Sequence, residues 1–414
     1  MNDHSCYWQF ITLEPAICSD ISFNRVDVIV VGGGLMGVSV AYWLARYGAN
    51  VLVVEQKKLA WSASGRNGGI VTIGPADEYI DAIRKFGRSV TREITQSTVN
   101  NHQLLENVLA EEQIEANYYT GGFLSLACSE AELRTLTKST SLMHSDGFSA
   151  QMIERSQCEH LMGTRLGKRF IAGSFSPDDG MIQPVAYVQG LAQAAIRRGA
   201  KFLINTFVTS LSRESHRWLI STSQGSFTAE QIVLATGEDI EKLLPPLEHV
   251  IQAVYDRIIV TEPTTIQMQV SWAANKVSEY GRQANSGALL IGGFSVNHRG
   301  KKNFDLQKTQ ACLAAYTSKA FPELYGLRAI TTWVGTMAVT IDNLPIVGAW
   351  PKEKGLWLIT GFGGHGLPFS QVVPCSLAKA IISQSSADLP SYYSPQRFFR
   401  DSNMLGGTAF SSIE

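Results

Sequence analysis

The residues with the clearest chemical purpose are three glycines and a glutamate near the start of the chain. Gly32, Gly34 and Gly37 form the pattern G-x-G-x-x-G after the apolar run 26–31, and Glu55 follows 18 residues after Gly37. Such glycines permit a tight turn, a close approach of pyrophosphate to the backbone and close packing of the next helix. The helix N-terminus attracts the phosphates, while the acid binds a ribose 2′-hydroxyl and repels a 2′-phosphate. The pattern predicts a site for FAD or NAD, not NADP; a structural turn that binds nothing is the alternative.

A second group with suitable chemistry is the run 59–70, in which an arginine and an asparagine stand between glycines. Small residues let the backbone pass close to a flat or charged ligand. The Arg66 guanidinium and the Asn67 amide can hydrogen-bond phosphate or the edge of a flavin. We therefore expect this loop to contact the cofactor, with an ordinary flexible loop as the alternative.

Two further glycine-containing segments follow apolar strands later in the chain. The first, A-T-G at 235–237, ends a strand where glycine permits a close backbone approach. The second, G-F-G-G-H-G at 361–366, separates a strand from a helix that reaches about residue 383, so another helix N-terminus is expected to point at the ligand. Pro374 lies inside this expected helix and should kink it.

The elements that position these groups follow from the hydrophobic periodicity. Strands over 26–31 and 50–54, joined by a helix over 35–47, make the first glycine pattern part of a βαβ unit. Further helices are expected within 77–117 and over 129–144, 185–198 and 305–320. Further strands are expected over 118–127, 201–208, 218–223, 226–229, 231–234, 250–261, 288–292 and 356–360.

The composition describes a globular chain of 414 residues, 45% hydrophobic and 17% charged, which is long enough for two domains or one large composite. The formal net charge of −1 removes any general electrostatic case for nucleic acid or acidic lipid as a partner. Six scattered cysteines, without C-x-x-C pairs, predict reduced thiols and no metal site. Neither a signal-peptide pattern nor an apolar run of roughly 18 residues is visible, so we expect a cytoplasmic protein without a transmembrane segment.

Taken together, these motifs resemble those of the FAD-dependent amine and amino-acid oxidoreductases of the D-amino-acid oxidase superfamily. The resemblance covers nearly all of residues 5–385. It rests on both glycine-rich loops, Glu55, S-G-R-N-G-G at 64–69, D-D-G-M-I-Q-P at 178–184, A-T-G at 235–237 and T-I-D-N-L-P-I-V-G at 340–348. The motifs are most similar to the gamma-glutamylputrescine oxidoreductase branch, with glycine and sarcosine oxidases more distant.

The resemblance implies an α/β fold, α+β overall, with a Rossmann-like FAD-binding domain interleaved with a substrate domain whose mixed β-sheet roofs the flavin. On this basis the FAD-binding domain takes residues 25–77, 150–245 and 328–390, and the substrate domain takes 78–149 and 246–327. An aromatic N-terminal tail, 1–24, which we expect to lie against the body of the protein, and a C-terminal tail, 391–414, complete the chain.

The resemblance also implies noncovalent FAD, because no cysteine stands where relatives attach flavin; Cys312 lies well before the W-x-G motif. Val208 would meet adenine through its backbone, and 363–367 would place a helix N-terminus at the flavin C2 carbonyl, where partial positive charge stabilises the reduced flavin. The predicted cofactor contacts are Gly32, Gly34, Leu35, Met36, Gly37, Glu55, Gln56, Ser64, Arg66, Asn67, Gly68, Gly69, Val208, Thr236, Gly237, Gly363, Gly364, His365, Gly366 and Leu367.

Two departures from the family pattern bear on the substrate and the electron acceptor. Glycine-oxidase-like relatives carry an arginine just after the W-x-G motif that binds the substrate carboxylate, but Met337 stands there in this chain. Sarcosine-oxidase-like relatives carry an oxygen-activating lysine where Leu290 stands. A simple α-amino acid therefore loses its usual anchor, and both O2 and another electron acceptor stay open.

Amine oxidation needs a neutral nitrogen, so that a hydride can leave the adjacent carbon for flavin N5. An alkylammonium with a pKa of about 10 is neutral in about one molecule in a thousand at pH 7. The site must therefore desolvate the ammonium or supply a base. The candidates for the reaction site are His365, Trp333, Tyr255, Arg257 and Arg282, with Tyr280 in addition, and a structural role is the alternative for each. Asp342 is expected to order its loop.

The sequence thus predicts an FAD-dependent oxidoreductase that oxidises the C–N bond of a primary or secondary amine, or of an amino-acid derivative, to an imine. One alternative is a D-amino-acid or imino-acid dehydrogenase with Arg282 or Arg257 as the carboxylate anchor. The other is a non-catalytic flavin-binding subunit of a complex.

Overall fold

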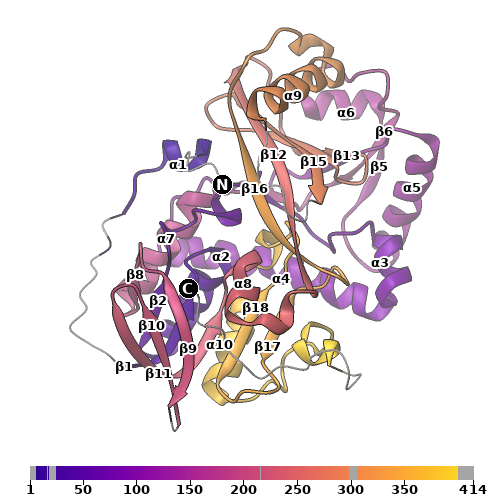
Figure 1. The fold of residues 1–414 in the computed structure, drawn as a ribbon. Helices are drawn as coiled ribbons and strands as arrows, with labels where there is room; N and C mark the ends of the chain where they lie inside the picture. Colours follow the sequence, from indigo (N-terminus) through magenta and orange to yellow (C-terminus); the bar gives the residue numbers. More distant parts are fainter. Residues whose placement is uncertain (1–5, 16, 18–24, 215, 298–304, 400–414) are drawn as a thin grey trace.

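The computed structural model describes residues 6–15, 17, 25–214, 216–297 and 305–399. It contains two large sheets, one in the lower and one in the upper half of Figure 1. Two long strands of the upper sheet, β12 (Ile251–Pro263) and β16 (Ala329–Thr340), run down towards the lower sheet. The mixed α/β architecture expected from the sequence is confirmed.

The lower sheet carries the first glycine pattern. Its order is β17-β18-β11-β1-β2-β8; in addition, β10 pairs with β11 and β9 pairs with β10. The strands are β1 (Arg25–Val31), β2 (Val51–Val54), β8 (Lys201–Leu203), β9 (Val208–Glu214), β10 (Arg217–Thr222), β11 (Gly225–Leu234), β17 (Ile346–Ala349) and β18 (Leu356–Thr360). β1 pairs in parallel with β2 and β11. Every residue of β2 and β18 is buried, as expected for parallel strands covered on both faces.

The upper sheet has the order β16-β12-β15-β14-β13-β4-β6-β5. Its remaining strands are β4 (Phe123–Leu126), β5 (Gln151–Glu154), β6 (Ala172–Ser176), β13 (Ser271–Ala274), β14 (Glu279–Gln283) and β15 (Ala288–Asn297). β13 pairs with β4 in parallel while the other pairs are antiparallel, so the sheet is mixed. β5, β6 and β16 pair in this sheet, although we assigned their ranges to the FAD-binding domain.

Helices lie in all the regions where the sequence predicted them, and three short helices over 7–11, 155–162 and 240–243 come in addition. The helices are α1 (Tyr7–Ile11), α2 (Leu35–Arg46), α3 (Tyr79–Phe86), α4 (Arg88–Glu111), α5 (Glu130–Ser145), α6 (Arg155–Met162), α7 (Pro184–Arg197), α8 (Ile240–Leu243), α9 (Leu306–Ala320) and α10 (Val372–Ser383). Ser129 and Asp305 cap α5 and α9 by accepting backbone N–H groups of Glu132 and Lys308. The single strand expected over 201–208 is wrong, because Asn205, with φ of +52°, turns the chain between β8 and β9.

The helical segment after the second glycine loop is divided, which corrects the expected kink at Pro374. A short 3₁₀ helix, η5 (Leu367–Phe369), comes first, and α10 begins only at Val372. Pro374 therefore lies in the first turn of α10, where a missing N–H breaks no helical hydrogen bond. The N–H groups of Gln371 and Val372 donate to Asn101 Oδ1 at 2.8 and 3.1 Å. The N-terminus of α10 is thus capped by α4.

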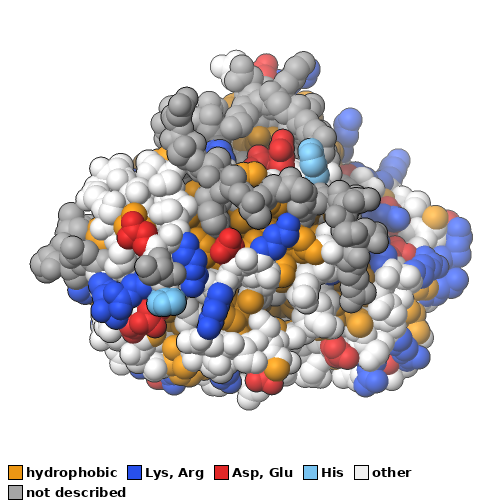
Figure 2. Space-filling model, turned by 60° about the horizontal axis from the view of Figure 1, so that its bottom comes forward, with side chains coloured by type: hydrophobic (Ala, Val, Ile, Leu, Met, Phe, Trp, Pro, Cys, Tyr) orange, Lys and Arg blue, Asp and Glu red, His pale blue; other side chains and the backbone are white. Residues whose placement is uncertain are grey.

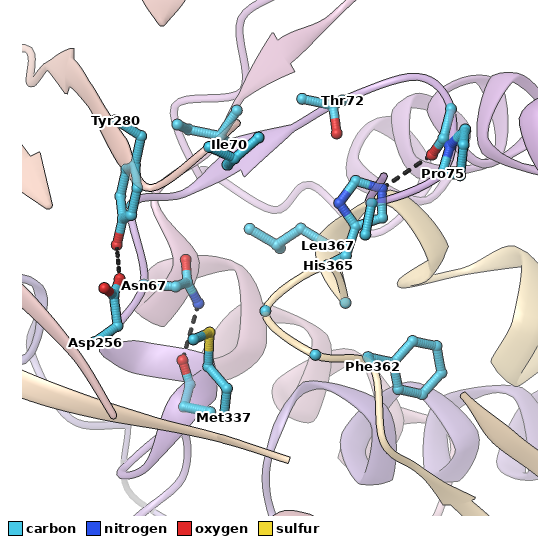
Figure 3. Close-up of a pocket in the computed structure, with 18 of the residues that line it drawn as sticks. Asn67, Ile70, Thr72, Pro75, Asp256, Tyr280, Met337, Phe362, His365 and Leu367 are labelled. Atoms are coloured by element: carbon cyan, nitrogen blue, oxygen red, sulfur yellow. Dashed lines mark hydrogen bonds between the residues drawn. The ribbon is translucent and has the colours of Figure 1, made fainter. Parts of the chain in front are cut away.

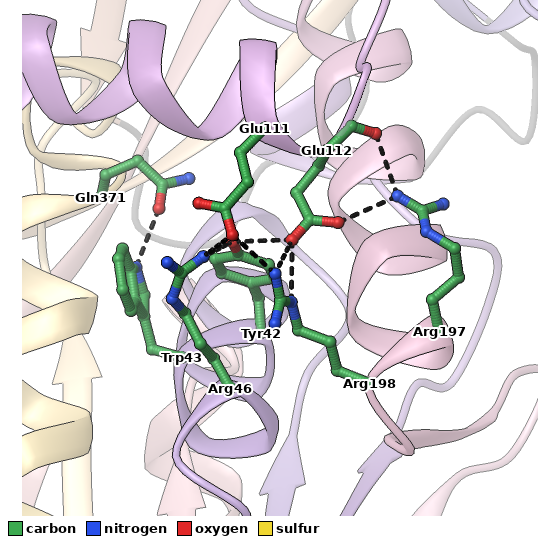
Figure 4. A network of polar contacts seen from close by, with 8 residues as sticks. All are labelled: Tyr42, Trp43, Arg46, Glu111, Glu112, Arg197, Arg198 and Gln371. Atoms are coloured by element: carbon green, nitrogen blue, oxygen red, sulfur yellow. Dashed lines mark hydrogen bonds and ion pairs between the residues drawn. The ribbon is translucent and has the colours of Figure 1, made fainter.

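A polar network joins α2, α4 and α7 (Figure 4). At its centre, the Glu112 carboxylate accepts hydrogen bonds from Tyr42 Oη at 3.0 Å, Arg197 Nη2 at 3.0 Å and Arg198 Nε at 2.8 Å. Burial alone would raise the pKa of Glu112, but the hydrogen bonds from Arg198, Tyr42 and Arg197 outweigh it and lower that pKa. The network therefore holds α4 and α7 against α2, the helix that follows the first glycine loop.

Both ends of the described chain pack against the body of the protein. Trp8 in α1 is buried and its Nε1 donates to Asn67 O at 2.9 Å, so the expectation for the aromatic tail is confirmed for this segment. Arg397 forms an ion pair with Asp342 at 2.7 Å, and Asp342 Oδ1 accepts the Leu344 N–H, which confirms that Asp342 orders its loop.

The charged surface and the cysteines match what the composition led us to expect, namely balanced charge and unpaired thiols. Figure 2 shows basic and acidic side chains interspersed over the face that it displays. The cysteines in the described ranges, Cys6, Cys128, Cys158, Cys312 and Cys375, are free, and Cys18 lies outside those ranges. Within the described ranges, no helix combines the length and apolar character that a membrane span requires.

Candidate active site

A cavity of about 500 Å³ lies where the glycine-rich loops of the lower sheet meet the upper sheet. Its floor comes from residues 34–36, 63–64, 66–70, 235, 237–238 and 359–367. Its roof comes from side chains of β12, β14, β15 and β16, and residues 72–79 close one side. The cavity therefore joins every glycine-containing segment that the sequence singled out.

The first glycine loop is packed so tightly that its glycines cannot be replaced. Gly32 has φ of +115°, and a Cβ there would lie 2.5 Å from Ala235 O. A Cβ on Gly37 would lie 2.0 Å from Gly32 O. Gly34, Leu35 and Met36 line the cavity, so the loop presents backbone to a ligand.

Glu55 lies beside this loop at the end of β2. Its carboxylate accepts the N–H groups of Gly33 at 2.6 Å and Lys57 at 2.8 Å, and burial raises its pKa. Its ribose contact stays a prediction. The other predicted cofactor contacts outside the cavity lining are Gly32, Gly37, Gln56, Val208 and Thr236, and all the remaining ones line it.

The loop at 63–69 is held in place by side chains that we had expected at the reaction site. Arg282 Nη1 donates to Gly69 O and to Ile182 O, both at 2.9 Å, and burial lowers the pKa of Arg282 to about 10. Trp333 Nε1 donates to Arg66 O at 3.1 Å. Neither Arg282 nor Trp333 lines the cavity. Their structural alternative is therefore correct: they position the loop.

The roof contains a buried acid, Asp256 of β12. The sequence had instead suggested its two neighbours in the chain, Tyr255 and Arg257, as residues that face the cavity. Successive side chains of a strand point to opposite faces. Asp256 lines the cavity, whereas Tyr255 and Arg257 do not, so the expectation that those two face it is wrong. Tyr280 of β14, also a candidate, lines the cavity and donates a short hydrogen bond from Oη to Asp256 Oδ2. Burial raises the pKa of Asp256.

His365 lines the cavity as expected, on the side opposite the Asp256–Tyr280 pair (Figure 3). A carbonyl oxygen only accepts, so His365 Nε2 carries a proton and donates to Gly74 O at 2.9 Å. Burial lowers the pKa of His365, which keeps the imidazole neutral at pH 7. The loop that carries it leads into η5, so the helix N-terminus that borders the cavity is that of η5 and not that of α10, and its contact with the flavin stays a prediction.

Met337 of β16 lines the cavity. It stands where glycine-oxidase-like relatives carry an arginine. Its side chain lies over Gly364, since a Cβ on Gly364 would be 2.5 Å from Met337 Sδ. Leu290 is buried in β15, outside the lining. The roof strands thus present the apolar side chains of Met337 and Ala338 beside the polar ones of Asp256, Tyr280, Ser295 and Thr336.

The ionisable side chains of the cavity lining are mostly carboxyl groups. Its carboxyl side chains are Asp77, Glu78, Asp179, Glu238 and Asp256, and its guanidinium is that of Arg66. Arg66 donates to Trp61 O at 3.0 Å and to Val334 O at 3.3 Å. Burial raises the pKa of Glu238 to about 7 and that of Asp179 well above its usual value. A raised pKa makes a carboxyl group a better proton acceptor, and the carboxylates that are ionised attract cations more than anions.

Comparisons with known proteins agree with the motifs. The family model described as "DAO: FAD dependent oxidoreductase" matches residues 27–373. The chain is 24% identical to gamma-glutamylputrescine oxidoreductase of Escherichia coli over 404 residues, 94% of this chain and 91% of that protein. It is 26% identical to one subunit of the opine oxidase of Rhizobium meliloti over 388 residues, 90% of this chain and 98% of that protein. The crystal structure of glycine oxidase from Geobacillus kaustophilus has the same fold, with a TM-score of 0.80 at 21% identity, covering 90% and 98% of the two chains.

The residues of the cavity fit a flavin dinucleotide. Backbone from three glycine-rich segments borders one continuous space, and Cβ atoms on Gly34 or Gly69 would collide with Ser64 Oγ or Ile182 O. The residues that would hold the cofactor are those of the first glycine loop, the loop at 63–69 and the loop at 361–367.

Proposed function

Because the chain belongs to the FAD-dependent oxidoreductases of the DAO family, we propose that it oxidises the C–N bond of a primary or secondary amine to an imine. Amino-acid derivatives whose carboxylate is remote or masked are included. The cofactor is FAD, which when bound supplies the hydride acceptor. The observation that carries the choice of substrate is the excess of carboxyl over guanidinium groups in the cavity lining, with Met337 where a carboxylate anchor was expected.

The chain's own residues then have three tasks. The apolar side chains Met337 and Phe362 exclude water from the hydrocarbon part of a substrate. Carboxyl groups in the roof and side wall attract the ammonium, and their burial makes them better proton acceptors than exposed carboxylates. The glycine loops and the residues that hold them fix the substrate's reacting carbon relative to the cofactor, which is a matter of positioning.

An anaerobic visible spectrum tests this proposal. The purified holoenzyme is mixed with primary and secondary amines and with α-amino acids, and flavin bleaching is followed. Amines are expected to bleach the yellow protein; no bleaching by any compound of either class would refute the proposal. Admission of air then separates an oxidase, which recolours quickly, from a dehydrogenase, which recolours slowly.

The rival dehydrogenase of D-amino or imino acids loses its support, because Arg282 and Arg257 lie outside the cavity lining. A second candidate is a component of a larger complex, and it is favoured by the relative that is itself one subunit of an opine oxidase. Turnover by the isolated chain, with its mass measured in solution under the same conditions, separates an independent enzyme from a dependent component.

A further inference from the structure

We infer that Asp256 binds the ammonium group of the substrate, so that the preferred substrates are cationic amines without an α-carboxylate. This inference rests on the proposed function. It gives a role to a side chain that no sequence motif marks, and it assigns the cavity an anchor of the opposite charge to the arginine of glycine-oxidase-like relatives.

The first support is the position of Asp256. The residue lies in the middle of β12, paired with Gly335 of β16, and it is 6% exposed. Figure 3 shows its carboxylate at the edge of the cavity, close to Tyr280 and on the same side as Met337. A buried carboxylate in a low-dielectric site interacts more strongly with a cation than an exposed one.

The second support is the set of groups that hold this carboxylate. Tyr280 Oη donates to Oδ2, and Ser295 Oγ donates to Oδ1 at 2.9 Å. Both donors are neutral hydroxyls, the backbone of Arg257 also hydrogen-bonds the carboxylate, and the roughly four acceptor sites of a carboxylate leave room for one more donor. The cation that acts on it, Arg257, lies outside the cavity lining, and burial outweighs its effect on the pKa of Asp256. Burial of such a carboxylate is unfavourable, and a bound ammonium would offset that cost.

The third support is the irregular backbone that builds the arrangement. The register between β12 and β15 shifts between Tyr255 and Arg257, opposite Gly293 with φ of +129° and Phe294 with φ of +56°. This bulge directs Ser295 towards Asp256. Bulges that redirect a side chain are enriched next to active sites.

The fourth support is the contact between the anchor and the cofactor loop. A Cβ on Gly68 would lie 3.0 Å from Tyr280 Cε2, and one on Gly292 would lie 2.5 Å from Tyr280 Cζ. The Tyr280 ring therefore fills space that two glycines leave, between the loop at 63–69 and Asp256. A substrate bound beside that loop lies within reach of the Asp256 carboxylate, and Met337 contacts its apolar part.

The test compares amines with α-amino acids that carry the same side chain, for example n-butylamine with D- and L-norvaline. Anaerobic stopped-flow reduction of the holoenzyme gives a limiting rate and a half-saturating concentration for each compound. The wild type is expected to saturate with the amine at a lower concentration than with either norvaline enantiomer.

In Asp256→Asn, loss of a charge-assisted hydrogen bond should raise the half-saturating amine concentration by roughly 10- to 100-fold, with a smaller change in the limiting rate. The matched control is Glu262→Gln, which neutralises an acid of the same strand outside the cavity and should leave both constants unchanged. FAD content and Tm are measured for each variant.

Should Asp256→Asn fail to fold, Ser295→Ala keeps the carboxylate and removes one donor; it should raise the half-saturating concentration several-fold. The inference would be overturned if the half-saturating amine concentration of Asp256→Asn lay within twofold of the wild-type value. It would also be overturned if the wild type saturated with norvaline at a lower concentration than with n-butylamine. Bleaching by norvaline alone would leave C–N oxidation standing and refute only the ammonium anchor, whereas no bleaching by any amine or amino acid refutes the proposed function itself.

Discussion

The Arg282 guanidinium donates to the carbonyl oxygen of Gly69, at 2.9 Å, and lies outside the cavity lining. Gly69 has φ of +70°, and its Cβ position is filled by Ile182 O, so the loop backbone passes between β14 and the segment before α7. Arg282 is thus a positioning residue for the cofactor loop. From the sequence, Arg282 was a candidate to bind the substrate carboxylate. In the structure it holds the backbone of the loop at 63–69 in place.

This relationship predicts the effect of Arg282→Met, which keeps the length of the side chain and removes its donors. The buried carbonyl of Ile182 loses this donor and that of Gly69 keeps only the Ile182 N–H, so the loop loosens and FAD should bind roughly 10- to 100-fold more weakly. Release of FAD, followed by its fluorescence, measures this. Arg328→Met, at an arginine 82% exposed, is the control and should retain FAD normally. Unchanged FAD affinity together with a loss of α-amino-acid binding would show that Arg282 is a substrate anchor after all.

Met337→Arg should move the preference of the enzyme towards α-amino acids. A guanidinium at this place in the roof can bind a carboxylate through two hydrogen bonds and repels an ammonium. We expect kcat/KM to rise at least about tenfold for norvaline and to fall for n-butylamine. Met337→Leu, an apolar change of similar volume, should keep the preference for the amine. An arginine variant that still prefers n-butylamine would show that the roof at Met337 does not contact the α-carbon substituents.

The sequence predicted which glycine-rich loops border the cavity, because those loops depend on local patterns, and their contacts with FAD stay predictions. The G-x-G-x-x-G turn requires glycine for backbone reasons that hold within one βαβ unit, and the loops at 64–69 and 361–366 line the same cavity. The roof could not be predicted in this way. Alternation along β12 allowed either Asp256 alone or Tyr255 with Arg257 to face the cavity, and only the packing of the two sheets decides between these choices.

The roles of Trp333 and Arg282 were hidden for a related reason. Each donates to a backbone carbonyl more than 200 residues away in the chain. Backbone carbonyls carry no signature in the sequence, so a buried arginine that serves them cannot be distinguished from one that binds a substrate. The strand expected over 250–261 contains an acid between apolar residues, and this signal could have drawn attention to Asp256.

His365 makes the folded protein sensitive to mild acid. Burial lowers its pKa in the folded state, so below about pH 6.5 the unfolded chain binds a proton that the folded chain does not. The stability therefore falls as the pH drops through this range, until the folded-state pKa is reached. His365→Gln retains an N–H donor for Gly74 O and cannot titrate, so its Tm, measured with saturating FAD, should fall less between pH 7.5 and 5.5 than that of the wild type. Equal losses of Tm in both proteins would contradict this assignment.

Glu112 makes a separate contribution at lower pH. Its folded-state pKa lies below that of the unfolded chain, because the hydrogen bonds from Arg198, Tyr42 and Arg197 outweigh burial. The stabilisation is therefore present above about pH 4.5 and is lost as the pH falls through the folded-state pKa. Glu112→Gln should cost about 1–3 kcal/mol at pH 7, since it weakens charge-assisted hydrogen bonds whose arginine partners are partly exposed.

Urea unfolding at several pH values, with FAD saturating, measures this cost. The difference between wild type and Glu112→Gln should be constant above about pH 5.5 and shrink as the pH falls below about 4.5, because the unfolded wild-type chain binds a proton at this carboxyl group before the folded protein does. Glu111→Gln is the matched control: Glu111 also pairs with Arg198 and with Arg46, but its side chain is 45% exposed. Its loss should cost less than about 1 kcal/mol. Equal costs for the two variants would mean that the buried position of Glu112 adds nothing to its contribution.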